Sequence, residues 1–393
     1  MSAISRQKLD QAAQWLSTGP YDAWMTFVRE TSGGSDPVLP LVLDGGLTWQ
    51  SALIVFKNGR KVAVVGNYDA DPLVASGDWD AVVPYVQSIR PPLREVLTKE
   101  MSGGGTVAVN WSESDDKADG LTLGMFRVLE KHLEGLPIEL VSAEPLLLHL
   151  RGVKSGEELR RMRGAIAATE EAFRFIEGFA RIGRTEREVY DAVHGWAEAR
   201  GYGFSWDPVG DPIVNSGPDS MVGHGIPSST IRIAEGHVFH IDLGLLVEGY
   251  ASDLQRCWYV GDAVPEDVSR ALDAVNGAIS AAAEALRPGV QGWTVDAAAR
   301  AAITGAGYPE YLHAVGHQVG RMAHDGGGIL GPQWERYGET PRHPVEAGQV
   351  YTLELGVEPP GRGYLGIEEM VLVTESGCEF LSRRQTSMPL LPR

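Results

Sequence analysis

Residues 240–253 read HIDLGLLVEGYASD. Asp242 and Asp253 lie in or beside apolar, strand-like runs, with Gly249-Tyr250 between them, as two strands joined by a turn would present them. Such a hairpin can bring both carboxylates to one spot. Because a carboxylate is costly in apolar surroundings unless it is paired or bound to metal, the two aspartates are candidate metal ligands.

Three later residues have similar surroundings. His317 lies in HAVGHQVG, Glu354 in YTLELG and Glu368 in YLGIEEM. Four carboxylates brought together repel one another, and each pair at ~4 Å costs roughly 4 kcal/mol at an effective dielectric constant of ~20. Two divalent cations would cancel the four charges, and oxygen ligands with one imidazole suit Mn, Co or Zn. The set therefore predicts a two-metal hydrolase.

Each residue taken singly is a weak signal. An Asp before Leu-Gly is more often a turn residue, and a lone His is more often a satisfied core group. Glu369, beside Glu368, is interpreted as a solvated neighbour or as an outer partner of the ligand. The ordered set of five is far more specific than any of its members.

Composition limits the classes of partner. The chain has 393 residues, too many for one ordinary core, so two domains are expected. Its net charge of −18 argues against nucleic acid and anionic membrane as partners, since both require basic patches. The N-terminus lacks the apolar stretch of a signal peptide, and no run of ~18 apolar residues predicts a membrane span. Cys257 and Cys378 show no paired spacing, so both are expected to be reduced in a cytoplasmic protein.

The first 150 residues read as a compact mixed domain. Asn58-Gly59 joins two strand-like runs and is a strong hairpin signal, because both residues readily adopt positive φ. A domain boundary is expected near residues 145–155. The predicted domains are therefore residues 1–150 and 151–393.

The second part begins with two capping boxes, Ser155 with Glu158 and Thr185 with Glu188, each of which predicts a helix start. Two further helices and five strand-like segments follow. The helices are expected over residues 266–286 and 295–304, and the strands over 237–246, 257–260, 312–315, 350–355 and 367–373.

The five candidate ligands, in this order and in these contexts, resemble the metallopeptidases of the pita-bread fold. The resemblance is closest to the Xaa-Pro dipeptidases (prolidases) and Xaa-Pro aminopeptidases, and the architecture is similar to that of creatinase. It covers most of residues 150–382. It implies an α+β protein with an N-terminal creatinase-like α/β domain followed by a C-terminal pita-bread domain.

The resemblance also implies roles for individual residues. Asp242, Asp253, His317, Glu354 and Glu368 would bind two divalent metal ions, manganese first, with cobalt or zinc as alternatives. Glu354 would also act as general base on the water that bridges the ions.

Three further histidines would surround the substrate. The resemblance implies that His224, in MVGHGIP, helps to hold the substrate, and that His313 and His324 lie around the scissile bond. His324 would steady the tetrahedral intermediate. These three residues are thus candidate substrate-binding and catalytic groups beside Glu354.

The implied chemistry is physically reasonable. Metal binding can lower the pKa of water from ~16 towards ~7, which gives a hydroxide nucleophile at neutral pH. A bond to proline has no N–H and a rigid ring, so a site for it needs a shaped apolar pocket. Tyr202, Phe204, Trp206 and Tyr311 are candidate linings of that pocket, with core packing as the alternative.

Four positions depart from the family pattern. Gly366 stands where an Arg is usual, Glu358 where a Tyr is usual, Gln255 where a Thr is frequent, and Asp325 where a Glu follows the last His. Arg362 is a candidate to replace the missing positive charge. The five ligands are intact, so these departures bear on substrate preference more than on metal binding.

Four functions remain open from the sequence. The first is an Xaa-Pro dipeptidase that acts on short proline-containing peptides, and the second an Xaa-Pro aminopeptidase that acts on longer ones. The others are a creatinase-like amidinohydrolase and a catalytically silent pita-bread binding protein. The family also implies a homodimer.

Overall fold

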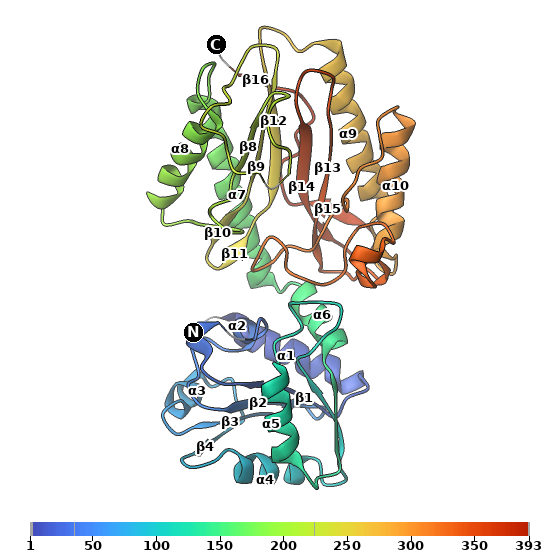
Figure 1. Ribbon diagram of the computed structural model, residues 1–393. Helices are drawn as coiled ribbons and strands as arrows, with labels where there is room; N and C mark the ends of the chain where they lie inside the picture. Colours follow the sequence, from blue (N-terminus) through green and yellow to red (C-terminus); the bar gives the residue numbers. More distant parts are fainter. Residues whose placement is uncertain (1–2, 35, 224, 392–393) are drawn as a thin grey trace. The chain divides into compact units, whose positions relative to one another are not determined.

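The computed structural model describes residues 3–34, 36–223 and 225–391 (Figure 1). The chain forms two compact units, residues 1–151 and 152–393, and each has its own core. The helices and strands of the first unit are α1 (Ala3–Thr18), β1 (Ala23–Val28), α2 (Leu39–Val42), β2 (Ser51–Phe56), β3 (Lys61–Gly66), α3 (Ala70–Ser76), β4 (Ala81–Tyr85), α4 (Arg90–Glu100), β5 (Gly105–Val109), α5 (Leu123–Leu133), β6 (Ile138–Ser142) and α6 (Glu144–Gly152).

The first unit is a three-layer α/β structure. Its six strands follow the order β4-β3-β2-β1-β5-β6, in which β1, β2 and β3 pair antiparallel and the remaining neighbours pair parallel. Alternate residues of β1 enter different cores, because successive side chains of a strand point to opposite faces. Trp24 packs with α1 and α6, whereas Met25 packs with α4 and α5. The hairpin predicted at Asn58-Gly59 joins β2 to β3 and is confirmed.

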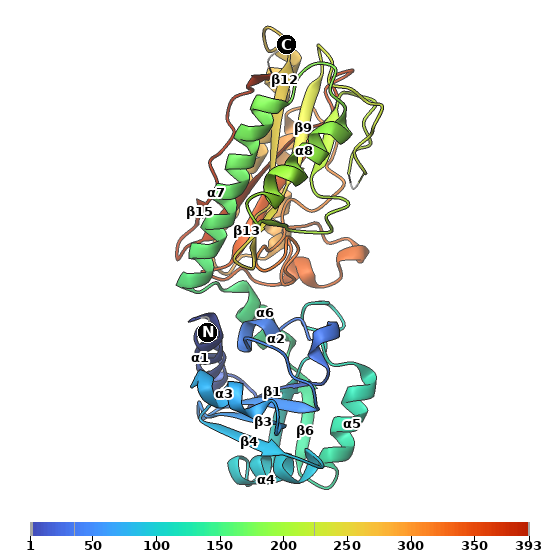
Figure 2. The same cartoon turned by 90° about the vertical axis from the view of Figure 1, so that its left-hand side faces the viewer.

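The second unit is built on an antiparallel sheet with the order β13-β14-β12-β9-β8. Figure 1 shows α7 and α8 beside the β8–β9–β12 part of this sheet, and α9 and α10 beside β13 and β14. Figure 2 shows the length of α7 along the unit. The elements are α7 (Gly156–Phe179), α8 (Glu186–Glu198), β7 (Gly203–Phe204), β8 (Ile213–Ser216), β9 (Val238–Leu243), β10 (Leu245–Val247), β11 (Tyr250–Ala251), β12 (Leu254–Val260), α9 (Glu266–Ala285), α10 (Gly292–Gly305), β13 (Val350–Val357), β14 (Leu365–Val373), β15 (Cys378–Phe380) and β16 (Leu390–Leu391).

Both predicted capping boxes are present. The Ser155 hydroxyl accepts from the Glu158 backbone N–H, and the Glu158 carboxylate accepts from the Ser155 backbone N–H in return. Thr185 and Glu188 repeat the arrangement at the start of α8. Each box satisfies backbone donors that a helix N-terminus leaves free, so the two helix starts follow directly from local sequence.

The hairpin between the two aspartates is more elaborate than the sequence suggested. The strand expected over residues 237–246 is interrupted at Gly244, whose N–H donates to the buried Asp211 carboxylate. A side chain at Gly244 would lie 2.5 Å from the Ser252 carbonyl oxygen, so the chain can bend there only with glycine. The tip is a two-residue turn at Glu248 and Gly249, with φ of 49° and 76°. Positive φ at both positions is the geometry that a tight hairpin requires.

Two other expectations need correction. Residues 312–315 do not form a strand. This segment is irregular, and Gly316 makes an isolated bridge to Leu330, which supplies the hydrogen bonds that a strand would have provided. The strand expected over 257–260 begins earlier, at Leu254, because its pairing with β9 extends to Leu243.

Within the described ranges, no helix has both the length and the apolar composition needed to cross a membrane. Cys257 and Cys378 are both free, as the sequence predicted.

Candidate metal centre

A row of polar side chains crosses the main sheet of the second unit. Cross-strand pairing places Asp242 of β9 opposite Gln255 of β12, Gln255 opposite Glu368 of β14, and Glu368 opposite Glu354 of β13. Directly opposed residues of antiparallel strands project from the same face. Three carboxylates and one amide from four strands therefore share one face of the sheet.

Asp253 and His317 join this row from outside the strands. Asp253 lies two residues before Gln255, on the same side of the chain, because side chains alternate along a strand. His317 is tied to β13 by hydrogen bonds in both directions, since its N–H donates to the Thr352 hydroxyl and its carbonyl accepts from the Thr352 N–H. The loop expected to carry His317 thus runs along the sheet and points its imidazole at the carboxylates.

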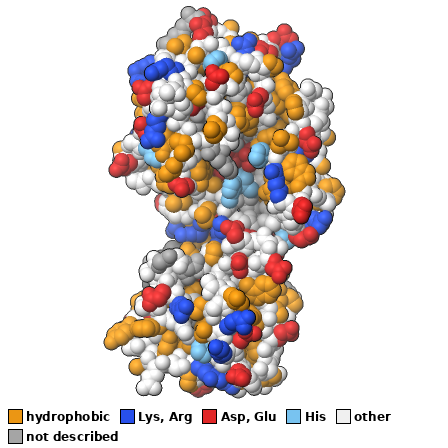
Figure 3. All heavy atoms as spheres, in the orientation of Figure 1, with side chains coloured by type: hydrophobic (Ala, Val, Ile, Leu, Met, Phe, Trp, Pro, Cys, Tyr) orange, Lys and Arg blue, Asp and Glu red, His pale blue; other side chains and the backbone are white. Residues whose placement is uncertain are grey.

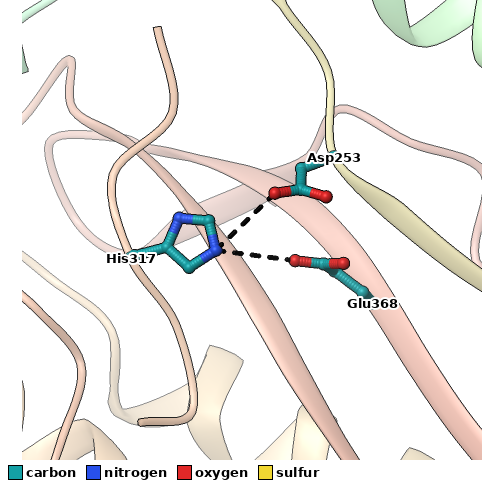
Figure 4. A group of neighbouring side chains, drawn as sticks. All are labelled: Asp253, His317 and Glu368. Atoms are coloured by element: carbon teal, nitrogen blue, oxygen red, sulfur yellow. Dashed lines mark ion pairs between the residues drawn. The ribbon is translucent and has the colours of Figure 1, made fainter. Parts of the chain in front are cut away.

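The imidazole lies at the centre of the acidic side chains. His317 Nε2 is 3.4 Å from Glu354 Oε1, 3.7 Å from Asp253 Oδ2 and 3.8 Å from Glu368 Oε1. Figure 4 shows Asp253, just before β12, and Glu368 of β14 converging on this nitrogen. One ligand atom each from Asp253, His317 and Glu368 lies within 4.8 Å of the other two. Four of the five predicted ligands therefore meet around His317, and Asp242 shares their face of the sheet.

Burial and mutual repulsion disfavour the charged forms of the carboxylates in the cluster. Burial raises the pKa of Glu368 well above its ordinary value, and the nearby Asp253, Glu354 and Asp242 raise it further. Burial and the neighbouring Asp242 and Glu354 likewise raise the pKa of Asp253. For Asp242, burial and Glu354 raise the pKa in the same sense. All three shifts show that the protein holds acidic groups together at a cost.

The residues fit a divalent metal centre. Both carboxylate oxygens of Glu368 and Oδ1 of Asp242 are buried without a hydrogen-bond partner, although buried polar atoms normally have one. These atoms belong to a group of hard oxygen donors with one imidazole nitrogen, the set that suits Mn, Co or Zn. Positive ions at this place would supply both the missing partners and the missing charge.

The structure places two of the three histidines predicted to surround the substrate. The His324 ring lies perpendicular to the His317 ring, with 4.3 Å between their centroids, so it borders the cluster. His313 lies earlier in the same loop, with 5.7 Å between the centroids of its ring and the Tyr311 ring. Both are exposed. Figure 3 shows histidine side chains gathered beside acidic ones on one face of this unit. His224 lies outside the described residues.

Glu369 has the opposite surroundings to its neighbour. The interpretation of Glu369 as a solvated residue is wrong, because it is fully buried on the other face of β14. Its carboxylate pairs with Arg256 at 2.9 Å, and Arg256 also donates to the backbone carbonyl of Glu368. Arg256 and Glu369 therefore fix the backbone from which the Glu368 side chain projects.

Arg362 does not replace the missing positive charge. Its guanidinium forms an ion pair with Asp267 at 2.9 Å and donates to the Gly236 carbonyl. The space beside Gly366 is filled by Tyr364 instead. A side chain at Gly366 would lie 2.4 Å from the Tyr364 ring, and one at Gly356, its cross-strand partner, would lie 2.3 Å from it.

Three of the four aromatic residues considered for a proline pocket have ring contacts that place them. Phe204 stacks on His194 of α8 with 4.2 Å between ring centroids, and Tyr202 packs against Trp196 of the same helix. These two pack against the helix. Tyr311 contacts His313 instead, with 5.7 Å between ring centroids, and burial, Tyr364 and Glu354 raise the pKa of its hydroxyl.

Sequence reasoning missed Asp211, a buried carboxylate beside Asp242. Asp211 is completely buried and accepts from the backbone N–H groups of Ser205 and Gly244. Its pKa is raised by burial and by Asp242. Asp211 precedes a proline in a Gly- and Pro-rich segment, so its local sequence suggests a turn and gives no sign of this position.

Comparison with known proteins identifies the family. Residues 160–375, more than half of the chain, match the model of metallopeptidase family M24. The chain belongs to this family, and it is a metallopeptidase. The predicted α+β architecture with a pita-bread domain is thereby confirmed.

Individual relatives agree with this assignment. The chain is 31% identical over 252 residues to an Xaa-Pro dipeptidase of Pyrococcus furiosus, covering 64% of this chain and 68% of that protein. Dipeptidase PepE from Mycobacterium ulcerans is similar in structure, with a TM-score of 0.75 and 26% identity over 100% of this chain and 99% of that one. An X-Pro aminopeptidase from Thermotoga maritima has a TM-score of 0.70 at 23% identity, covering 97% of this chain and 99% of that one, and so shares the fold.

Proposed function

We propose that this protein is an Xaa-Pro dipeptidase that uses two divalent metal ions, manganese first and cobalt or zinc as alternatives. The observation that carries the proposal is the convergence of Asp253, His317 and Glu368, with Glu354 beside them, at a buried site with unpartnered oxygen atoms. The Xaa-Pro dipeptidase of Pyrococcus furiosus, at 31% identity, supports the choice of substrate.

The roles of the residues follow from their positions. Asp242, Asp253, His317, Glu354 and Glu368 are proposed to hold the ions, whose Lewis acidity would acidify water and polarise a carbonyl group. Glu354 is proposed as the general base, and two features suit it to this role. It is the least buried of the three glutamate and aspartate side chains that contact His317, and its second oxygen accepts from Gln255. A proton taken from water can thus be held at a carboxylate that the protein keeps oriented.

The histidines are proposed to act on the substrate. His324 borders His317 and is exposed, so its N–H can donate to the oxygen of a tetrahedral intermediate. His313 and His224 are proposed to hold the peptide on either side of the scissile bond. The proposed assembly is a cytoplasmic homodimer, which size-exclusion chromatography with light scattering would test.

The experiment that tests the function compares Ala-Pro with Ala-Pro-Ala-Ala, with each of Mn²⁺, Co²⁺ and Zn²⁺ added after chelation. We expect release of proline from Ala-Pro and slower cleavage of the longer peptide. Equal or faster cleavage of Ala-Pro-Ala-Ala would favour an Xaa-Pro aminopeptidase instead, the class whose structure from Thermotoga maritima shares the fold. His324→Ala serves as the matched variant, and it should lose activity while it keeps the metal.

Elemental analysis separates an enzyme from a silent binding protein. Protein purified without chelator should contain more than one Mn, Co or Zn per chain, or should acquire it when metal is added. A protein that stays below one ion per chain under both conditions would contradict the proposed function.

A further inference from the structure

A continuous line of buried polar groups leads away from Glu354. Gln255 Nε2 donates to Glu354 Oε2 at 3.2 Å. Gln255 Oε1 lies 3.1 Å from His240 Nε2, and His240 Nδ1 lies 3.0 Å from Asn215 Oδ1. The three side chains Asn215, His240 and Gln255 expose 3%, 2% and 6% of their surface, so water does not compete for these contacts.

Strand pairing sets the course of this line. Asn215 of β8 is opposite His240 of β9, and Asp242, two residues after His240, is opposite Gln255 of β12. The line therefore runs across β8 and β9 beside the row of acidic side chains and joins that row diagonally at Gln255. Each member sits on a strand that also carries or adjoins a ligand, so its position is set by the backbone of the sheet.

The contacts fix the orientation of the Gln255 amide. A neutral imidazole carries one N–H, so His240 can donate to Gln255 Oε1 from Nε2 or to Asn215 Oδ1 from Nδ1, but not to both. The tautomer with its N–H at Nε2 is the one that supports Gln255. Gln255 Nε2 faces a carboxylate, which can only accept a hydrogen bond. A flip of the Gln255 amide would direct an oxygen at the Glu354 carboxylate, and the resulting repulsion disfavours it.

Tyr364 limits the conformations open to the Gln255 side chain. The Tyr364 ring lies edge-on to the His240 ring, with 4.9 Å between their centroids. It occupies the space that Gly356 and Gly366 leave open, and a side chain at Gly366 would lie 2.6 Å from Gln255 Oε1. The amide is thus enclosed between the ring, the sheet and the carboxylate.

We propose that Gln255 is a positioning residue that holds the Glu354 carboxylate through its side-chain amide, and that His240, with its single N–H at Nε2, holds this amide in one orientation. The inference rests on the proposed function, because it assigns Gln255 to a carboxylate that binds metal and takes a proton. Partners behind a metal ligand orient it, and their loss typically weakens metal affinity 10–100-fold.

The test replaces the amide with an apolar side chain of similar length. Gln255→Met should weaken binding of Mn²⁺ to the weaker of the two sites about 10–100-fold, measured by isothermal titration calorimetry on chelated protein. With Ala-Pro, kcat should fall at least tenfold while KM changes less than threefold, because the lost contact orients a catalytic carboxylate and does not touch the substrate. Thermal melts of each variant establish that it is folded.

A second variant tests whether His240 acts through Gln255. His240→Phe keeps an aromatic ring against Tyr364 but leaves Gln255 unsupported, and it should weaken Mn²⁺ binding about 3–10-fold. In the Gln255→Met background it should cause no further loss. Gln349→Met is the matched control, since Gln349 is equally buried but contacts Tyr351 and Glu346 instead. It should leave the Mn²⁺ affinity within twofold of wild type.

Two results would overturn the inference. The first is a folded Gln255→Met variant that binds Mn²⁺ within twofold of wild type. The second is an equal loss from His240→Phe in both backgrounds. Failure of the wild-type protein to cleave Ala-Pro would contradict the proposed function alone, because the calorimetric results do not depend on peptide hydrolysis.

Discussion

Removal of one carboxylate from the cluster should stabilise the metal-free protein and weaken its stabilisation by metal. The change is Glu368→Gln, which keeps the shape of a side chain that is only 1% exposed and removes its charge. Glu368 and Asp253 can each place one oxygen within 4.8 Å of the other. Two unit charges at this separation repel by about 3 kcal/mol at an effective dielectric constant of ~20.

Protonation relieves part of this repulsion at neutral pH, because burial and the neighbouring carboxylates raise the pKa of Glu368. We therefore expect the free energy of unfolding of the metal-free variant to exceed that of the metal-free wild type by about 1–3 kcal/mol. For a unit of this size, each kcal/mol corresponds to about 2–4 °C in Tm. Differential scanning calorimetry in EDTA at pH 7 should show the gain.

Added Mn²⁺ should reverse the order of stability. A ligand at 100 to 1,000 times its Kd stabilises a folded protein by about 2.7–4.1 kcal/mol, so the wild-type Tm should rise by several degrees. The variant should respond weakly, since one of its ligands is lost. Glu379→Gln is a suitable control, because this exposed residue lies on β15 of the same sheet and pairs with Arg163. A variant that is less stable than wild type in EDTA, or that gains as much from Mn²⁺, would refute the reasoning.

Three further predictions concern other parts of the molecule. Burial raises the pKa of Asp36 from 3.8 to about 6, so ionisation of this group lowers the free energy of unfolding as pH rises through that interval. Between pH 4.5 and pH 8, the free energy of unfolding of Asp36→Asn should therefore increase by about 2 kcal/mol relative to that of wild type. Urea denaturation at both pH values would measure this difference. Gly366→Ala should lower the free energy of unfolding by about 1–3 kcal/mol and should lower kcat, because its methyl group would clash with the Tyr364 ring. Thermal melts and Ala-Pro assays would measure both effects. A variant with unchanged Tm would contradict the packing of Tyr364 against Gly366. Asp325→Ala should lower the free energy of unfolding by about 3–5 kcal/mol, because it removes the carboxylate that lies 3.4 Å from the buried Lys154 ammonium group. A decrease of less than 1 kcal/mol in urea denaturation would show that this ion pair is unimportant for stability.

The sequence could predict features that depend on local patterns. The capping boxes at Ser155 and Thr185 need only residues three positions apart, and the Asn58-Gly59 hairpin needs only two strands and a turn, so both were recognisable. The five candidate ligands were recognisable for a related reason. An acidic residue or a histidine within an apolar strand requires an explanation wherever the strand lies.

The tertiary structure decided the features that depend on register and on the second face of each strand. Glu368 and Glu369 are adjacent in sequence, yet one projects among the ligands and the other pairs with Arg256 on the opposite face. Arg362 was a reasonable source of positive charge, but the chain directs it to Asp267 and fills the place with Tyr364.

By itself, then, the sequence predicted a cluster of metal-binding side chains, because isolated buried charges are too costly to occur without partners. It also determined the helix starts and the tight turns, whose causes lie within a few residues. Only the tertiary structure determined which neutral groups support the cluster. Gln255 and His240 became its neighbours through the pairing of β9, β12 and β14, and a one-residue change of register would have turned them to the other face.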